Sequence, residues 1–265
     1  MFPPSPPDHT AQTSPGAPPF PPFLGPDGVT RIPRSLPRFP AHSTPLETHL
    51  PIDGELVPVA FVHDALRNRA YDLLQSVRTA SLDGLLPGSP RRLRRALVDP
   101  ALPRPTNVLE ISFDDSDDIV EVVCHAVVLA ASGSPILSRL VYDVDQQNLP
   151  TPCVSASPDS HPRQQITLPV IPLRLPRISS WQPLHDWLYE RSSTKLRLDL
   201  VGTDTEVLAP VGAEKAVLAG RRTLIGRLDG IRQLWLNVVG LELKDPELER
   251  VMAEAWTSLH DALVS

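Results

Sequence analysis

The distribution of proline constrains the fold of this chain more than any other feature of its sequence. The chain has 265 residues and 32 prolines, and 14 of the prolines lie between Met1 and about Leu50. Proline has no backbone N–H and a fixed φ, so this stretch cannot build helices or central strands. We therefore expect residues 1–50 to form a disordered or polyproline-like arm outside the folded part.

Two stretches of the arm, Pro3–Pro7 and Pro18–Pro22, have the PxxP spacing that SH3-type grooves accept. No arginine lies close to either stretch to fix the orientation of a bound peptide. The sequence therefore favours a plain linker over a docking motif.

Composition and charge narrow the class of protein. Hydrophobic residues make up 41% of the chain, which is enough for a core, and the net charge of −6 argues against non-specific affinity for nucleic acids or membranes. Cys124 and Cys153 are the only cysteines and form no CxxC pair, so we expect a reducing compartment with no disulfide scaffold or zinc site. The sequence has no apolar run of membrane-spanning length and no secretory signal, so it predicts an intracellular, soluble protein in the nucleus or cytoplasm.

Residues 51–106 are expected to hold an amphipathic helix and a basic linker. Apolar residues recur at helical spacing from Val59 to about Ala80. Glycines and prolines between Gly84 and Pro90 end this helix. A short basic helix, Arg91–Leu97, is expected before further prolines interrupt the chain.

From residue 107 to residue 265 the pattern is that of an α/β domain, more narrowly α+β, with a small sheet and packed helices. Residues Leu109–Phe113 alternate between apolar and polar, as in a half-buried strand. Asp114–Asp118 is expected to be a polar turn, with Ile119–Cys124 as the partner strand. The next two helices are expected to begin after His125 and at Pro135.

After a Pro- and Ser-rich insert over residues 146–163, a third strand is expected at Ile166–Leu168, ended by prolines. Ser179 or Ser180 can cap a helix that carries Trp181 and Leu188. The alternation at Leu196–Leu200 predicts a further strand, although this stretch is ambiguous. The rest is predicted to be helical, with apolar stripes between Val217 and Val238 and a last helix capped by Asp245, with Pro246 in its first position.

No motif in the sequence indicates an enzyme. Asp114–Asp118 lacks the glycine and glutamate of an EF-hand calcium loop. Cys124 and His125 are neighbours whose side chains are expected to point to opposite faces, so they cannot easily act on one substrate. The GxSxG, GxGxxG and HExxH patterns are absent. We predict no catalytic residue, no cofactor and no metal ligand, and we expect all four tryptophans to be structural: Trp181, Trp187, Trp235 and Trp256.

The strongest local charge feature is a cluster of four arginines in five residues. This cluster could be a nuclear-import patch or a phosphate-contacting surface. The alternative without a specific function is a solvated helix face in a linker. Ser89 precedes a proline and then the cluster, so it is a candidate phosphosite for a proline-directed kinase. The cluster consists of Arg91, Arg92, Arg94 and Arg95.

The order of expected elements resembles the core of the BTB/POZ interaction fold. The residues that carry this resemblance form two halves, separated by some 25 residues of insert. The resemblance implies a module that works by presenting surfaces to protein partners. The halves are Cys124–Ala131 with Ser134–Leu140, and Ile166–Leu168 with Trp181–Tyr189.

A broader region, from about Val57 to Leu263, resembles basidiomycete proteins of the clampless type, which are required for clamp-cell formation. This resemblance implies a nuclear regulator that acts below the mating-type homeodomain factors through protein contacts, with no catalytic residues. The long insert and the weak strand at Leu196–Leu200 depart from ordinary BTB domains. The stretches that carry the resemblance are Ile166–Pro176, Leu184–Tyr189, Ile231–Val238 and Ala255-Trp256.

The main prediction is a non-enzymatic interaction module whose partners are proteins, such as transcription regulators of the mating-type pathway. Two alternatives stay open. One is a nucleic-acid-binding transcription factor that uses the arginine cluster, and the other is a BTB-type ubiquitin-ligase adaptor. Homodimer formation is also left open, whereas binding to a membrane is not expected.

Overall fold

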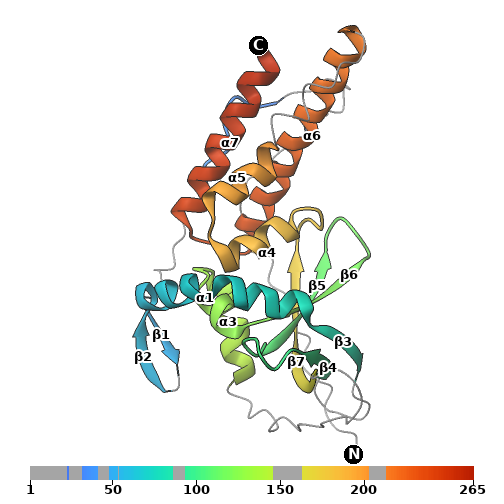
Figure 1. The fold of residues 1–265 in the computed structure, drawn as a ribbon. Coiled ribbons are helices and arrows are strands. Elements are labelled where there is room, and N and C mark those ends of the chain that lie inside the picture. Colours follow the sequence, from blue (N-terminus) through green and yellow to red (C-terminus); the bar gives the residue numbers. More distant parts are fainter. Residues whose placement is uncertain are drawn as a thin grey trace, which may run out of the picture.

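The protein is a mixed α/β protein, as the sequence predicted, with a curled sheet at one end and stacked helices above it (Figure 1). The computed structural model describes Phe23 and residues 32–40, 48–52, 54–85, 93–145, 163–202 and 213–265. The expected PxxP stretches, Ser89, Arg91, Arg92 and Cys153 lie outside the described residues.

Among the described residues, the main sheet has five strands in the order β3-β4-β7-β5-β6. β5 and β6 pair antiparallel around the turn at Asp114–Asp118, which confirms the expected hairpin. β7 then pairs parallel to β5 and antiparallel to β4. The strands are β3 (Ser81–Leu85), β4 (Leu93–Val98), β5 (Asn107–Phe113), β6 (Ile119–Cys124) and β7 (Gln164–Leu175).

Strand β7 is longer than expected, because it continues through Pro169 and Pro172. Its first half, residues 164–169, pairs with β4, and its second half, residues 170–175, pairs with β5. Within the part of the chain that the structure describes, each half therefore has an edge without a ladder partner, and proline is tolerated at such edges because its missing N–H is not needed there. The prediction that the prolines end the strand was wrong for this reason.

The expected basic helix at Arg91–Leu97 is also wrong, because residues 93–98 form strand β4. Leu93, Ala96 and Val98 are buried in the sheet. β4 lies between β3 and β7 and is hydrogen-bonded to both, and pairing on two sides outweighs the local helix preference of arginine and leucine.

The predicted strand at Leu196–Leu200 is likewise wrong, because these residues belong to helix α5 (Ser193–Val201). The hydroxyl of Ser192 accepts a hydrogen bond from the backbone N–H of Lys195 and caps the helix. Leu196 and Leu200 are buried, and Leu198 between them is 50% exposed. Two buried residues four positions apart are typical of one face of a helix. The leucines at every second position suggested a strand instead.

The other expected helices are confirmed. The helix after His125 and the helix with Pro135 in its first turn are both present, and Asp245 caps the last helix through its side chain. Ser180 occupies the N-cap position of α4, but its side chain makes no capping bond. These helices are α1 (Val59–Thr79), α2 (Ala126–Ala130), α3 (Pro135–Asp145), α4 (Trp181–Glu190), α6 (Ala213–Gly240) and α7 (Pro246–Val264).

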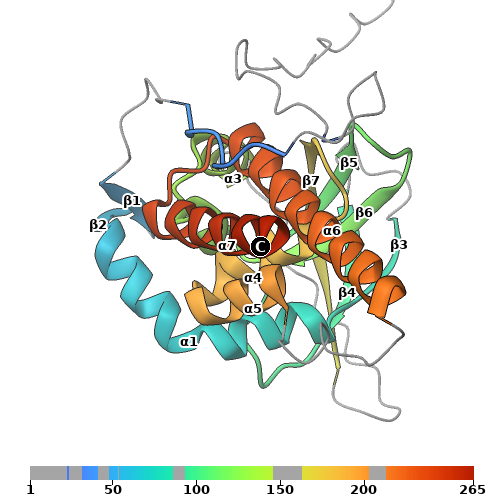
Figure 2. The same cartoon turned by 90° about the horizontal axis from the view of Figure 1, so that it is seen from above.

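α6 and α7 form an antiparallel pair that rises from the rest of the molecule, and α4 and α5 lie between this pair and α1 (Figures 1 and 2). All four tryptophans are buried in the core. Among the described residues, no helix is both long and apolar enough to cross a membrane.

Two parts of the expected arm have defined positions. Residues 32–40 pack along α6 and α7, with Ile32, Leu36 and Phe39 partly buried. A small hairpin, β1 (His49–Ile52) with β2 (Glu55–Pro58), leads directly into α1. The sequence did not predict either feature.

Candidate functional site

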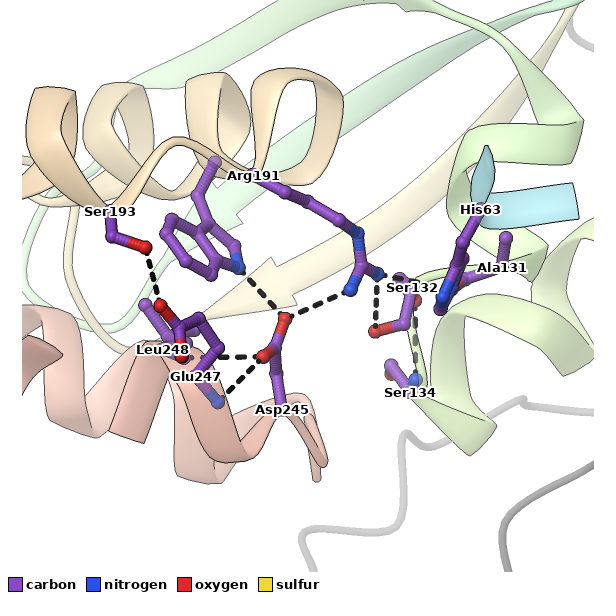
Figure 3. Close-up of polar contacts among 10 residues, drawn as sticks. His63, Ala131, Ser132, Ser134, Arg191, Ser193, Asp245, Glu247 and Leu248 are labelled. Atoms are coloured by element: carbon purple, nitrogen blue, oxygen red, sulfur yellow. Dashed lines mark hydrogen bonds and ion pairs between the residues drawn. The ribbon is translucent and has the colours of Figure 1, made fainter. Parts of the chain in front are cut away.

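A cavity of about 350 Å³ lies where α1, the turn between α2 and α3, the end of α4 and the start of α7 meet. Its wall includes His63, Ser134, Arg191 and Asp245. Figure 3 shows these side chains and the polar contacts between them. Volumes of 300 to 1,000 Å³ are typical of ligand pockets, so this cavity is the candidate functional site.

Arg191 joins two sides of the cavity. It follows the last residue of α4 and has a φ of 45°, the left-handed conformation that often ends a helix. Its Nη1 donates to Asp245 Oδ2 over 3.1 Å, and its Nη2 donates to the carbonyl oxygens of Ala131 at 3.1 Å and Ser132 at 3.4 Å. Burial lowers the pKa of Arg191, and the charge of Asp245 opposes this shift.

Asp245 is the acceptor at the centre of the contacts in Figure 3. Its Oδ2 also accepts from the indole Nε1 of Trp187 over 2.9 Å. Its Oδ1 accepts from the backbone N–H groups of Glu247 and Leu248, at 3.1 and 3.2 Å, and so caps α7. The sequence predicted the cap, but it did not predict that the same carboxylate binds Trp187 and Arg191.

Side chains from α1 and from the start of α3 complete the polar wall. His63 Nε2 donates to the carbonyl oxygen of Ala131 over 2.6 Å, and burial lowers the pKa of this histidine. Ser134 Oγ donates to the carbonyl oxygen of Leu241 over 2.5 Å and accepts from the N–H of Leu137 over 3.1 Å. The serine hydroxyl thus caps α3 and ties it to the turn after α6.

These contacts define what the cavity can do. Arg191, Asp245, His63 and Ser134 all bond to neighbouring protein groups, so the wall is formed before anything binds. A preformed polar wall can orient a ligand or a segment of a partner through hydrogen bonds. Within the described residues, no group of three or more His, Cys, Asp or Glu side chains is placed to hold a metal ion.

Cys124 and His125 belong to a buried cluster and do not line the cavity. The backbone N–H of His125 donates to Tyr189 Oη over 3.1 Å, and its ring lies 3.2 Å from the same oxygen and 3.3 Å from Ser76 Oγ. Burial lowers the pKa of His125 to about 4 and raises the pKa of the Cys124 thiol far above its usual value. The cluster joins the end of β6 to α1 and α4.

The two described arginines of the cluster, Arg94 and Arg95, lie in strand β4 and have different surroundings. Arg94 forms an ion pair with Glu121 on β6, with Nη2 and Nε at 2.5 and 2.8 Å from Oε1. Arg95 is exposed. The Arg94 side chain is therefore held in an ion pair across the sheet, while the side chain of Arg95, in the same strand, faces solvent.

The cavity residues were missed by sequence reasoning because they come from four distant parts of the chain. Only Asp245 could be recognised from the sequence, as the helix cap that precedes a proline at a helix start. No family model, no curated protein and no solved structure matches this chain.

Proposed function

We propose that this protein is an interaction module with a BTB/POZ-like core that regulates fungal sexual development, in the formation of clamp cells. It acts through protein partners in the mating-type pathway and works in the nucleus. The chain's resemblance to clampless-type proteins supplies the biological setting, and the arrangement of elements around β7 supplies the physical support.

The observation that carries the proposal is the way in which the two halves of the split pattern meet. α2 and α3 connect β6 to β7, and β7 lies parallel to β5, the first strand of the hairpin. α4 follows, and Tyr189 near its end bonds to His125 at the start of the first half. The residues on which the BTB/POZ resemblance rests therefore form one connected unit.

A candidate partner surface lies on β2 and α1. Leu56 is 72% exposed, Phe61 68% and Tyr71 78%, although each side chain is large and mainly apolar. Leu73 and Leu74 of α1 pack into the core. Large exposed hydrophobic groups on these two consecutive elements favour a protein contact.

The test uses a basidiomycete strain that lacks the endogenous gene. Expression of the unmodified protein is expected to restore clamp cells, whereas the double variant Phe61→Ala/Tyr71→Ala is expected to restore few or none. The matched control is Leu198→Ala/Val264→Ala, which removes exposed apolar groups from α5 and α7 instead.

Clamp frequency at septa is counted, while blotting and thermal melting check that all variants accumulate and fold. Normal clamps in the deletion strain would refute the developmental role. Full rescue by Phe61→Ala/Tyr71→Ala would refute the α1 surface and leave the developmental role standing.

A further inference from the structure

Two tryptophans on the C-terminal helices hold the backbone of residues 32–40. The indole Nε1 of Trp256 on α7 donates to the carbonyl oxygen of Pro33 over 3.1 Å. The indole Nε1 of Trp235 on α6 donates to the carbonyl oxygen of Pro37 over 3.2 Å. Figure 2 shows this segment, in blue, running beside α7 and past α6.

Aromatic rings add to these two hydrogen bonds. Phe39 lies 5.9 Å from Trp235 between ring centroids, and Phe23 lies 5.7 Å from Trp256. Both pairs are tilted, an arrangement that aromatic rings prefer over a flat stack. We call this surface of α6 and α7 the two-tryptophan face.

The held segment contains a short repeat that matches the two tryptophans one for one. Ile32-Pro33-Arg34 and Leu36-Pro37-Arg38 have the same aliphatic–Pro–Arg order, four residues apart. In each copy the proline carbonyl accepts from one indole, the aliphatic side chain packs on the core, and the arginine is exposed. Recognition of proline-rich peptides by other proteins uses the same elements, namely aromatic surfaces and backbone carbonyl acceptors.

We propose that the two-tryptophan face is a binding site for proline-rich segments with the aliphatic–Pro–Arg repeat, and that the chain's own arm occupies it as a displaceable ligand in cis. No described residue of this segment is in a helix or a strand, so neither helical hydrogen bonds nor a strand ladder holds it to the body. The contacts described above that attach it are the two indole bonds and the apolar and aromatic contacts. This site is distinct from the α1 surface, so either assignment stands without the other.

Tethering explains why the site is filled. A ligand on a short linker has an effective concentration in the millimolar range, so even weak binding keeps it in place. A free peptide of the same sequence must compete with this internal ligand. We therefore expect the unmodified chain to bind such a peptide poorly, and a chain with a weakened arm to bind it better.

The experiment uses the full chain and a fluorescein-labelled synthetic peptide that spans residues 18–42. The opened variant, Phe23→Ala/Phe39→Ala, weakens the arm but leaves both tryptophans intact. Fluorescence anisotropy is expected to show about tenfold tighter peptide binding to the opened variant than to the unmodified chain, since both aromatic pairs of the arm are lost. A scrambled peptide of the same composition is the control.

A second variant tests the indole donors. Trp235→Phe/Trp256→Phe, added to the opened variant, keeps two aromatic rings but removes both N–H groups, so the gain in peptide binding is expected to disappear. Absence of binding to the folded opened variant would overturn the proposal, as would binding that does not depend on the two indoles.

If the tryptophan variants do not fold, a protease site placed within residues 41–47 of the full chain gives an independent answer. After cleavage, release of the arm on dilution and its replacement by the peptide would support a displaceable ligand. An arm that leaves only on denaturation would overturn the proposal. A dimer in sedimentation that dissociates once the arm is cleaved and displaced would overturn the cis assignment, because the arm would then bridge two copies.

Discussion

At the scale of single residues, His125 couples the stability of the protein to pH. Its ring is buried between Tyr189 and Ser76, and the charges of Arg69 and His185 also disfavour its protonation. Its pKa is about 4 in the folded protein and 6.5 in the unfolded chain. Below pH 6.5 the unfolded state therefore takes up a proton that the folded state refuses, and the folded state loses stability.

We predict that the free energy of unfolding falls between pH 6.5 and pH 4 by roughly 3 kcal/mol because of this residue. His125→Gln should remove most of that slope, which urea titrations at several pH values measure. His49→Gln is the control, because His49 is exposed. His63 has a lowered pKa of its own and contributes a slope of the same sign, so His63→Gln is introduced both into the unmodified chain and into His125→Gln. An unchanged slope in His125→Gln would contradict the prediction.

At the scale of helices and turns, Asp245 connects α7 to the end of α4. It caps α7, accepts from Trp187 and pairs with Arg191, so its removal breaks a cap and leaves a partly buried guanidinium without its counter-charge. Asp245→Ala is expected to cost about 3 to 5 kcal/mol, the usual range for one partner of a buried pair. Urea unfolding measures this, with the exposed Asp261→Ala on the same helix as the control, expected within about 0.5 kcal/mol. A cost near 1 kcal/mol would mean that only the cap matters.

Elements differed in how well the sequence predicted them, and the reason lies in where their hydrogen bonds go. Helices with local start signals, such as Pro135 and Asp245-Pro246, were predicted because their caps lie within the same few residues. Strand β4 was not predictable from its own residues, because its partners lie in β3 and β7. The candidate site was harder still: Arg191 and His63 become neighbours only through contacts with Ala131, which no local pattern encodes.

At the scale of the whole molecule, we predict that the arginine cluster serves localisation and stability through different residues. Arg91→Ala/Arg92→Ala/Arg95→Ala leaves the Arg94–Glu121 ion pair intact, so its melting is expected to be unchanged while a fluorescent fusion loses its nuclear excess. Arg94→Ala is expected to do the reverse, with a loss of about 1 to 3 kcal/mol. Microscopy and thermal melting of both variants, with the unmodified chain as reference, measure both effects. A 29.1 kDa protein also diffuses passively through nuclear pores. The expected effect is therefore the loss of a nuclear excess of fluorescence, not complete exclusion of the fusion from the nucleus. Early melting of the triple variant would contradict the division of roles.

The divided pairing of β7 has a consequence for the order in which the chain folds. Val98 pairs with Gln164 and Val108 with Val170, so both ladders join residues that lie more than 60 positions apart in sequence. The β5–β6 hairpin and the helices need only local contacts, whereas closing such long loops slows folding. We therefore expect β7 to be the late strand, whose arrival converts two separate hairpins into one sheet. During synthesis the earlier strands must wait, with unpaired edges, until residue 175 has left the ribosome.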